Sequence, residues 1–327
     1  MSNFVEMPIA KAINAGIRKA MAENPKVLVF GEDVAELGGV FRVTEGILAE
    51  FGPKRIFNSP IAESGIVGTA IGLAMRGYRS VAEIQFDGFI FPAFDQITTQ
   101  LAKMQNRSEG FLTMPVVIRV PYGGGIGAVE HHSESPEAYF AHTAGLRVVS
   151  PSNPNDAYWM IQQAIASNDP VMFFEPKRRY WQKGPVNLDT PPLPMHSARV
   201  LREGTSATIA TYGPMVTVAL QAAEIAAEEG THLEVIDLRS LSPIDFTTII
   251  ESVKKTGRLV VAAEASTFVS VSSEIAARVS EQAFYHLQAP VIRVGGFDVP
   301  YPPAKLEEVF LPDADRILDA VDRIMAY

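Results

Sequence analysis

The sequence predicts an α/β protein of two domains, each built on a mainly parallel sheet with helices on both faces. Short apolar runs alternate with amphipathic segments through the 327 residues, a pattern typical of repeated strand–helix units. A chain of this length can bury two separate cores. Residues 184–197 lack periodicity and are rich in proline, so we expect a stiff linker between domains at 1–183 and 198–327.

The first domain is expected to open with a helix, because Ile9, Ile13 and Ile17 recur at helical spacing before Asn24-Pro25. Capping sequences predict two later helix starts, at Ser135-Pro136-Glu137 and at Asn153-Pro154. Further helices are predicted at 44–51, 63–77 and 92–107, and buried strands at 27–30, 81–86, 114–120, 146–149 and 171–175.

The second domain shows the clearer alternation. Ser242, with Pro243 behind it, is expected to cap one of its helices. Strands are predicted at 207–211, 233–236, 259–262 and 291–294, and helices at 215–228, 245–255, 270–284 and 313–325.

Composition excludes several classes of function. The formal net charge of −9 argues against a nucleic-acid partner and suits a basic protein partner or simple solubility. The absence of cysteine excludes disulfides, thiolate catalysis and cysteine-ligated metal sites. No apolar run approaches the roughly 20 residues of a membrane span, and residues 1–11 lack a signal-peptide core. We therefore expect a cytoplasmic protein without membrane contact.

One carboxylate, Glu63, stands where a loop enters a helix that is rich in small residues. Gly65, Gly68, Thr69 and Gly72 follow at spacings of three and four, which places them on one helical face. Another backbone can approach such a face closely, and a carboxylate in that setting needs a hydrogen-bonding partner. The alternative is that Glu63 only complements the helix dipole.

Residues 123–128 formally fit the dinucleotide-binding pattern G-x-G-x-x-[GA] after a predicted strand. Their context does not fit, since Pro121 interrupts the strand exit and the residues that follow form a poor helix for a pyrophosphate. A turn that places His131 and His132 is the better interpretation. In an extended chain neighbouring side chains point opposite ways, so at most one of these histidines faces a site. Their spacing does not suit zinc, and no metal site is predicted.

Taken together, several segments resemble one family, the beta subunit of the thiamine-diphosphate-dependent decarboxylase component of 2-oxoacid dehydrogenase complexes. The resemblance covers nearly the whole chain. It implies a pyrimidine-binding domain of the thiamine-diphosphate type at 1–183 and a transketolase C-terminal-like α/β domain at 198–327. The segments that carry it are 31–34, 38–46, 61–65, 83–86, 91–96, 132–138, 174–178, 237–239 and 256–258.

The resemblance implies roles for five residues. Glu63 matches the glutamate that hydrogen-bonds a ring nitrogen of the cofactor's aminopyrimidine, and Phe89 matches an aromatic residue against that ring. Many relatives have tyrosine there, so Phe89 keeps the stacking surface and loses the hydroxyl. Ile61 and Gln85 match positions that line the same pocket. His132 matches an active-site histidine that hydrogen-bonds or transfers a proton during decarboxylation or acyl transfer to the lipoyl group.

The chain lacks the Gly-Asp-Gly motif, with a following Asn pair, that in this family binds magnesium and the diphosphate on the alpha subunit. The resemblance therefore implies half an active site, completed by an alpha subunit in an alpha-two beta-two assembly with Mg²⁺ on the alpha chain. It also implies that the lipoyl acyltransferase core docks on the C-terminal domain. The acids Asp313, Asp315, Asp319 and Asp322 either contribute there or form a solvated helix face.

Some relatives bind potassium near Met114 and the loop at Ser167, but family side-chain ligands are not preserved at Val117 or Ser167. For the substrate, segments 121–127 and 130–133 are similar to those of bacterial branched-chain enzymes. We therefore expect 3-methyl-2-oxobutanoate, with pyruvate or acetoin as the alternative. Two other functions stay open: a nicotinamide-dependent oxidoreductase that uses the glycine loop, and a non-catalytic scaffold subunit.

Overall fold

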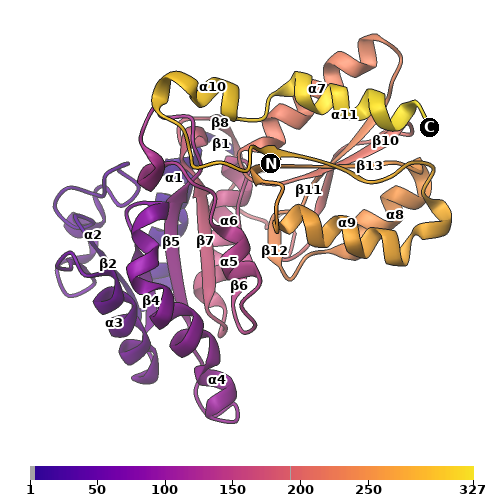
Figure 1. Cartoon of the computed structure of the whole chain (residues 1–327). Coiled ribbons are helices and arrows are strands. Elements are labelled where there is room, and N and C mark those ends of the chain that lie inside the picture. The colour runs from indigo at the N-terminus through magenta and orange to yellow at the C-terminus, as the bar shows by residue number, and fades with distance from the viewer. Residues whose placement is uncertain (1–3, 192) are drawn as a thin grey trace.

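The computed structural model describes residues 4–191 and 193–327, which form two lobes (Figure 1). Residues 1–3 and Pro192, a member of the predicted linker, lie outside the described residues. The first lobe is built on a sheet of strand order β12-β6-β7-β5-β4-β2-β3, parallel except for β12. Its strands are β2 (Val27–Gly31), β3 (Ile56–Asn58), β4 (Arg79–Glu83), β5 (Val116–Tyr122), β6 (Arg147–Val149), β7 (Val171–Pro176) and β12 (Ser240–Ser242).

Helices cover both faces of this sheet. On one face α1 (Ile9–Glu23) packs against α6 (Pro154–Ala166), and their apolar residues share a core with the strands. On the other face lie α3 (Glu63–Met75) and a series of shorter elements. These are the 3₁₀ segments η1 (Asp87–Ala93) and η3 (Leu101–Lys103), the π-helical η2 (Gln96–Gln100), and the short helices α4 (Met104–Arg107) and α5 (Glu137–Ala141). The helix α2 (Ile47–Phe51) lies beside β3.

The second lobe has a sheet of order β14-β13-β10-β11-β9, parallel except for β9. Its strands are β9 (Arg199–Arg202), β10 (Ala207–Thr211), β11 (Leu233–Asp237), β13 (Leu259–Ser266) and β14 (Ile292–Gly296). In Figure 1, α7 (Met215–Glu228) and α11 (Ala314–Met325) lie on one face, and α8 (Phe246–Thr256) and α9 (Val271–Gln282) on the other. The turns η6 (Phe284–His286) and η7 (Ala304–Leu306) and the short α10 (Glu307–Phe310) complete it.

The predicted α/β framework is confirmed, and the structure differs from the prediction at four places. Residues 184–187 of the expected linker belong to a strand, β8 (Lys183–Asn187), which pairs antiparallel with β1 (Phe4–Pro8). Residues 92–107 are helical throughout but irregular, because they are divided among the 3₁₀ segments η1 and η3, the π-helical η2 and the short α4. Pro121 does not interrupt β5 but lies inside it, paired with Glu175. Ser242 does not cap α8, because Asp245 accepts the hydrogen bond from the backbone N–H of Thr248 at 3.2 Å.

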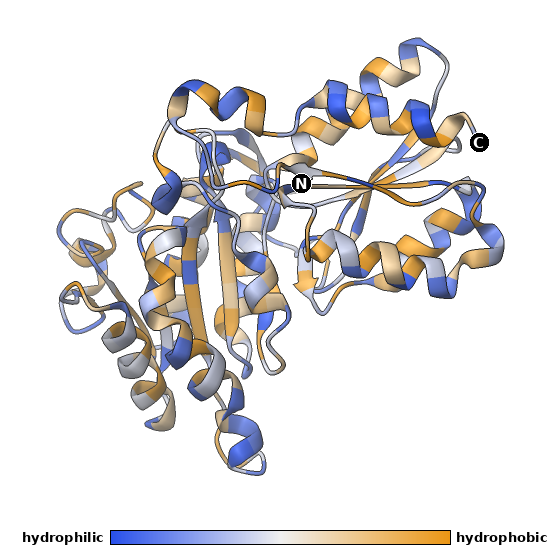
Figure 2. Ribbon diagram, viewed as in Figure 1, coloured by the Kyte–Doolittle hydropathy of each residue, from blue (hydrophilic) through white to orange (hydrophobic). Residues whose placement is uncertain are grey.

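One hydrophobic core runs through both lobes, from α3 and β5 to α8 and α9. Figure 2 shows apolar residues along the central strands β5 and β7, where helices cover both faces of the sheet. Within the described ranges, the helices are all too short or too polar to cross a membrane.

Candidate functional site

The predicted site residues all follow the carboxyl ends of parallel strands. Ile61 and Glu63 come after β3, Gln85 and Phe89 after β4, and His132 after β5, in the turn η4 (Glu130–His132). Because parallel strands end at the same edge of a sheet, these segments meet at one edge of the first lobe. In open α/β sheets this edge is where ligands bind.

The ring of His132 lies against two aromatic rings from η1 and the residue before it. The centroid of the imidazole is 4.3 Å from that of Phe86 and 5.1 Å from that of Phe89, both edge-on. Its Nδ1 atom is buried and has no hydrogen-bond partner among the described residues. Burial lowers the pKa of His132, helped by the charges of Lys177 and His131. The imidazole is therefore neutral at neutral pH and can accept a proton or a hydrogen bond.

A second group of polar side chains surrounds Glu32, directly after β2. Glu32 is buried, and its Oε1 atom has no partner in the part of the chain that the structure describes. Burial raises the pKa of Glu32, and the carboxylates of Glu63, Asp33 and Glu83 raise it further. Gln85 Nε2 lies 3.3 Å from the carbonyl oxygen of Glu32, to which it donates. Glu32 thus lies near enough to Glu63 for their charges to interact, and its backbone carbonyl binds Gln85.

Glu63 itself is the first residue of α3 and is half-buried. Ile61, just before it, is 85% exposed. The face with Gly68 and Gly72 is open, since a Cβ added at either would meet no described atom within 4 Å. The close approach of another backbone expected at this face does not occur within the described chain.

A buried charge network lies inside the sheet below these groups. Arg119 on β5 donates to both carboxylate oxygens of Glu175, at 2.6 and 2.8 Å, and to Glu83 at 2.5 Å. The hydroxyl of Tyr180 donates to Glu175 at 2.5 Å. Burial raises the pKa of Glu83, while the Arg119 charge opposes that shift. The network ties β4, β5 and β7 together at the edge where the site residues emerge.

The glycine loop at 123–127 is bound by the second lobe. Glu307 accepts hydrogen bonds from the backbone N–H groups of Gly125 and Gly127, both at 2.9 Å, and Glu264 accepts one from Gly124. These are the N–H groups that a pyrophosphate would need. The loop therefore joins the two lobes, which argues against the nicotinamide alternative.

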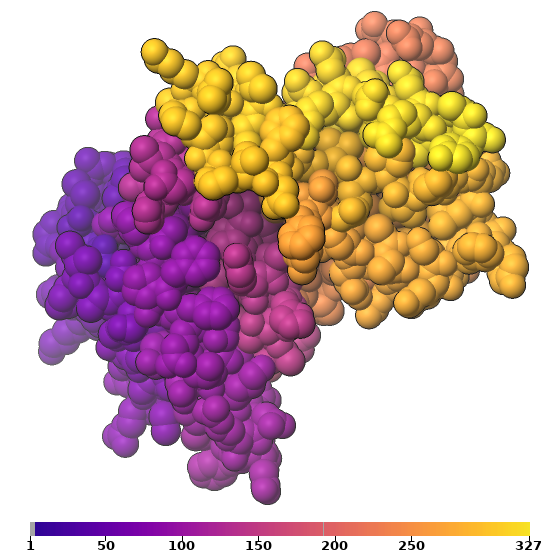
Figure 3. All heavy atoms as spheres, viewed as in Figure 1, coloured from indigo at the N-terminus to yellow at the C-terminus, as the bar shows by residue number. Residues whose placement is uncertain are grey.

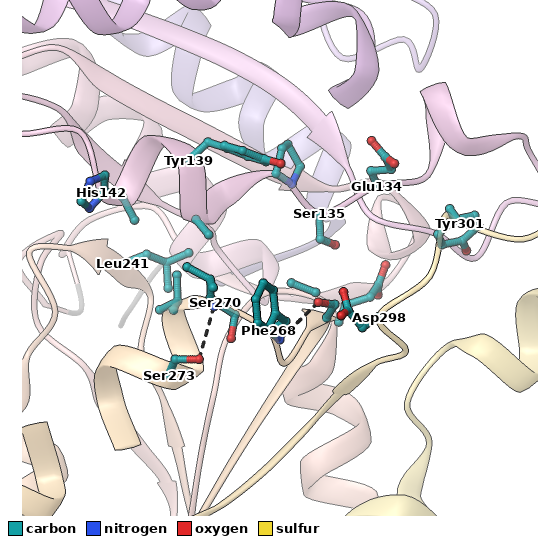
Figure 4. Close-up of a pocket in the computed structure, with 18 of the residues that line it drawn as sticks. Glu134, Ser135, Tyr139, His142, Leu241, Phe268, Ser270, Ser273, Asp298 and Tyr301 are labelled. Atoms are coloured by element: carbon teal, nitrogen blue, oxygen red, sulfur yellow. Dashed lines mark hydrogen bonds between the residues drawn. The ribbon is translucent and has the colours of Figure 1, made fainter. Parts of the chain in front are cut away.

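A cleft of about 1410 Å³ opens between the lobes and adjoins the His132 segment. Figure 3 shows it as the hollow between the first lobe and the second. In Figure 4, Glu134, Ser135 and Tyr139 come from the first lobe, and Phe268 and Asp298 from the second. The wall of the cleft contains the acids Glu134 and Asp298 and also exposed apolar side chains such as Phe268. The cleft therefore offers an acidic and partly apolar surface next to the site.

No group of three or more His, Asp or Glu side chains in residues 4–191 and 193–327 could hold a metal ion. At the loop around Ser167, where the sequence left a potassium site in question, a cationic side chain is present. Arg79 donates to the carbonyl oxygens of Ile165 and Ser167, at 3.0 and 2.7 Å, and to the side chain of Asn168 at 2.8 Å.

Comparison with known proteins agrees with this geometry. The family model of the transketolase pyrimidine binding domain matches residues 5–182, and the family model of the transketolase C-terminal domain matches residues 196–317. A pyruvate dehydrogenase E1 component subunit beta of Leifsonia xyli subsp. xyli is 68% identical over 321 residues, covering 98% of this chain and 95% of that protein. The chain belongs to the family of E1 beta subunits of 2-oxoacid dehydrogenase complexes.

Other relatives of this beta subunit are named for a substrate other than pyruvate. The 3-methyl-2-oxobutanoate dehydrogenase subunit beta of Mycobacterium tuberculosis is 53% identical over 320 residues, covering 98% of this chain and 92% of that protein. A solved structure described as a split gene transketolase, inactive beta4 tetramer, has a TM-score of 0.81 and 26% identity, covering 98% of both chains. The expected transketolase-like two-domain fold is confirmed. The family implies thiamine diphosphate as cofactor and an alpha subunit as partner.

Sequence reasoning gave no role to Phe86, which contacts His132 in this beta subunit, or to Asp87 and Lys177, which pair beside the His132 segment. A signal for them was available. Asp87 and Lys177 are charged residues that come shortly after buried strands, at the edge where ligands bind in such sheets.

Proposed function

We propose that this chain is the beta half of a branched-chain 2-oxoacid dehydrogenase and that its share of the active site lies between Glu63 and His132. The observation that carries the proposal is the meeting of the His132 and Phe89 rings, 5.1 Å apart, at the edge where Glu63 also emerges. Thiamine diphosphate, when bound, supplies a nucleophilic carbon and an electron sink for decarboxylation.

The residues present fit the aminopyrimidine end of that cofactor. Such a ring has flat faces and a hydrogen-bonding edge, and the chain offers the Phe89 ring together with the carboxylates of Glu63 and Glu32. Buried polar atoms without partners are rare, yet Oε1 of Glu32 and Nδ1 of His132 both lack one among the described residues. Such atoms are typical of a binding site.

Each residue has a role in this proposal. Glu63 would hold a proton between its carboxyl oxygen and a ring nitrogen, while Gln85 and Ile61 line the pocket and Phe89 packs against the ring face. His132, with its neutral imidazole, would donate a hydrogen bond to the reacting acyl group or transfer a proton.

The remainder of the site would come from an alpha subunit in an alpha-two beta-two assembly, with Mg²⁺ and the diphosphate on that chain. The open face at Gly68 and Gly72 supports this, because it leaves room for a second backbone. For docking of the acyltransferase core, Asp315, Asp319 and Asp322 on α11 are exposed. Asp313 is exposed too and also caps the helix, where it accepts a hydrogen bond from the backbone N–H of Arg316 at 2.9 Å.

The substrate proposal rests on segments 121–127 and 130–133, whose residues are similar to those of branched-chain enzymes. Pyruvate is the second candidate, because a relative of 68% identity is named for it. Both substrates are short 2-oxoacids that undergo the same decarboxylation. Their turnover rates can therefore be compared in one assay.

The test is co-expression with the alpha chain, followed by decarboxylation assays on 3-methyl-2-oxobutanoate and pyruvate with thiamine diphosphate and Mg²⁺. We expect activity only when both chains are present, and faster turnover of the branched substrate. Each chain alone is the control. Activity of this chain alone would contradict the shared site, and faster turnover of pyruvate would reverse the substrate assignment.

A further inference from the structure

A buried ion pair between Asp87 and Lys177 lies beside the segment that carries His132. The chemistry proposed above does not use this pair. Lys177 Nζ is 2.7 Å from Oδ1 of Asp87, and neither side chain is exposed. A buried pair is weak evidence for stability, because the loss of hydration opposes the attraction between the charges. Its presence therefore calls for another explanation.

Asp87 joins this pair to the segment that carries His132. Its second oxygen, Oδ2, accepts a hydrogen bond from the backbone N–H of Glu134 at 2.7 Å. Gly88 contacts the backbone on the other side of the histidine, since a Cβ at Gly88 would lie 2.6 Å from the carbonyl oxygen of His131. The backbone on both sides of His132 is thus held by two consecutive residues of η1.

The imidazole of His132 is fixed by packing. It meets Phe86 at an interplanar angle of 65° and Phe89 at 75°. The ammonium of Lys177 lies 5.9 Å from the centroid of the Phe86 ring. Because Nδ1 of His132 has no partner in the described ranges, these contacts determine how the ring lies.

Lys177 also influences the charge of His132. Burial is the largest cause of the lowered pKa of His132, and the Lys177 charge adds to it. The other titratable groups that act on His132 or on Lys177 are Glu130, His131, Asp87, Glu264 and Glu307.

We propose that Asp87 and Lys177 are positioning residues for His132: the pair anchors residues 131–134 and so fixes the place and orientation of the imidazole. This inference rests on the proposed function only for what His132 does in the reaction. The anchoring is a property of the folded chain and can be measured without turnover.

The paired substitution Asp87→Asn with Lys177→Met removes both charges and nearly keeps the side-chain volumes. Its matched control is Glu234→Gln with Lys255→Met, the same change at a carboxylate–lysine pair in the second lobe. In the complex with the alpha subunit, we expect the site variant to lose about 100-fold in kcat with little change in KM, the loss that a displacement of about 1 Å can cause. The control variant should keep wild-type values of both.

Histidine-selective NMR of the chain alone provides a second readout, with the His132 signal assigned from its loss in His132→Gln. We expect the site variant to raise the pKa of His132, since the Lys177 charge and the tight packing are both lost. Lys177→Arg keeps the ion pair and should keep the wild-type titration. An unchanged His132 titration together with an unchanged kcat in the site variant would overturn the proposal.

Two further variants keep the outcomes separate. If the neutral pair does not fold, Gly88→Ala displaces the same segment without removing a charge, and a wild-type kcat in that variant would overturn the proposal. His132→Gln with full activity would instead overturn the catalytic role of His132 in the proposed function. The NMR shift in the site variant would then still stand.

Discussion

The two halves of the candidate site differ in how far this chain completes them. Around His132 the ring is packed against Phe86 and Phe89, and the backbone is held on both sides. Around Glu63 the side chain is only half-buried, and the preceding Ile61 is 85% exposed. One half is therefore formed within the subunit, while the other is open in the way expected of a surface that meets a second chain. Substitutions in each half can test this difference.

The largest effect is expected at the open half, from Glu63→Gln. In the complex with the alpha subunit, decarboxylation should fall by at least about 100-fold, because a group that holds a proton in the reaction contributes on that scale. The thermal midpoint of the isolated chain should hardly change, since Glu63 is half-buried and makes no ion pair among the described residues. Steady-state kinetics and thermal unfolding measure the two quantities.

The control for this prediction is Asp315→Asn, which changes an exposed acid in the first turn of α11. It should alter neither activity nor stability. Turnover close to wild type in Glu63→Gln would count heavily against the assigned role of Glu63.

The next effect concerns a buried acid of the closed half, Glu137. Burial raises the pKa of Glu137 to about 7, although its Oε1 accepts a hydrogen bond from Tyr212 at 2.6 Å. The folded pKa of Glu137 lies above the unfolded value of 4.5, so the protonated side chain stabilises the folded protein. This stabilisation is fully present below pH 4.5. It is lost as the pH rises through about 7. The shift corresponds to about 3 kcal/mol.

Glu137→Gln stays neutral at every pH and so isolates this contribution. Urea unfolding of both proteins between pH 4.5 and 8 should show the wild type losing stability relative to the variant up to about pH 7, with no further divergence above it. Asp87, whose pKa burial raises to about 6, titrates in both proteins and cancels in the difference. Parallel profiles would contradict the shift at Glu137.

A smaller effect is expected from Gly88→Ala in the closed half. The added Cβ would lie 2.7 Å from the Cα atom of His131, so the His132 segment must move. We expect a loss of about 1–3 kcal/mol in unfolding free energy, typical of overpacking, and a fall in kcat of about 10-fold. Urea unfolding and kinetics check both. The control is Ser280→Ala, which changes an exposed residue on α9 far from the His132 segment in the sequence.

The closed half also shows what sequence patterns predict and what they miss. Apolar periodicity and capping are local, so β10 and α7 were predicted at the residues where they occur, and Asn153 caps α6 as expected. The edge strands β9 and β12 were missed because their pairing partners lie elsewhere in the chain. Within the site, the resemblance named His132 and Phe89. The Asp87–Lys177 pair joins residues 90 positions apart, and no local pattern shows such a contact.

The smallest effect is expected at the open half, from Gly72→Ala on α3. An added Cβ meets no described atom within 4 Å, and alanine favours a helix interior by about 0.5–1 kcal/mol over glycine. The isolated chain should therefore become slightly more stable in urea unfolding. If the glycine face receives the alpha subunit, the same methyl group should weaken assembly, measured as a rise in the Kd between the two chains. Ser280→Ala should stabilise slightly and leave the Kd unchanged. Unchanged assembly in Gly72→Ala would show that the open half meets its partner through another surface, and Glu63 would then need a different explanation for its exposure.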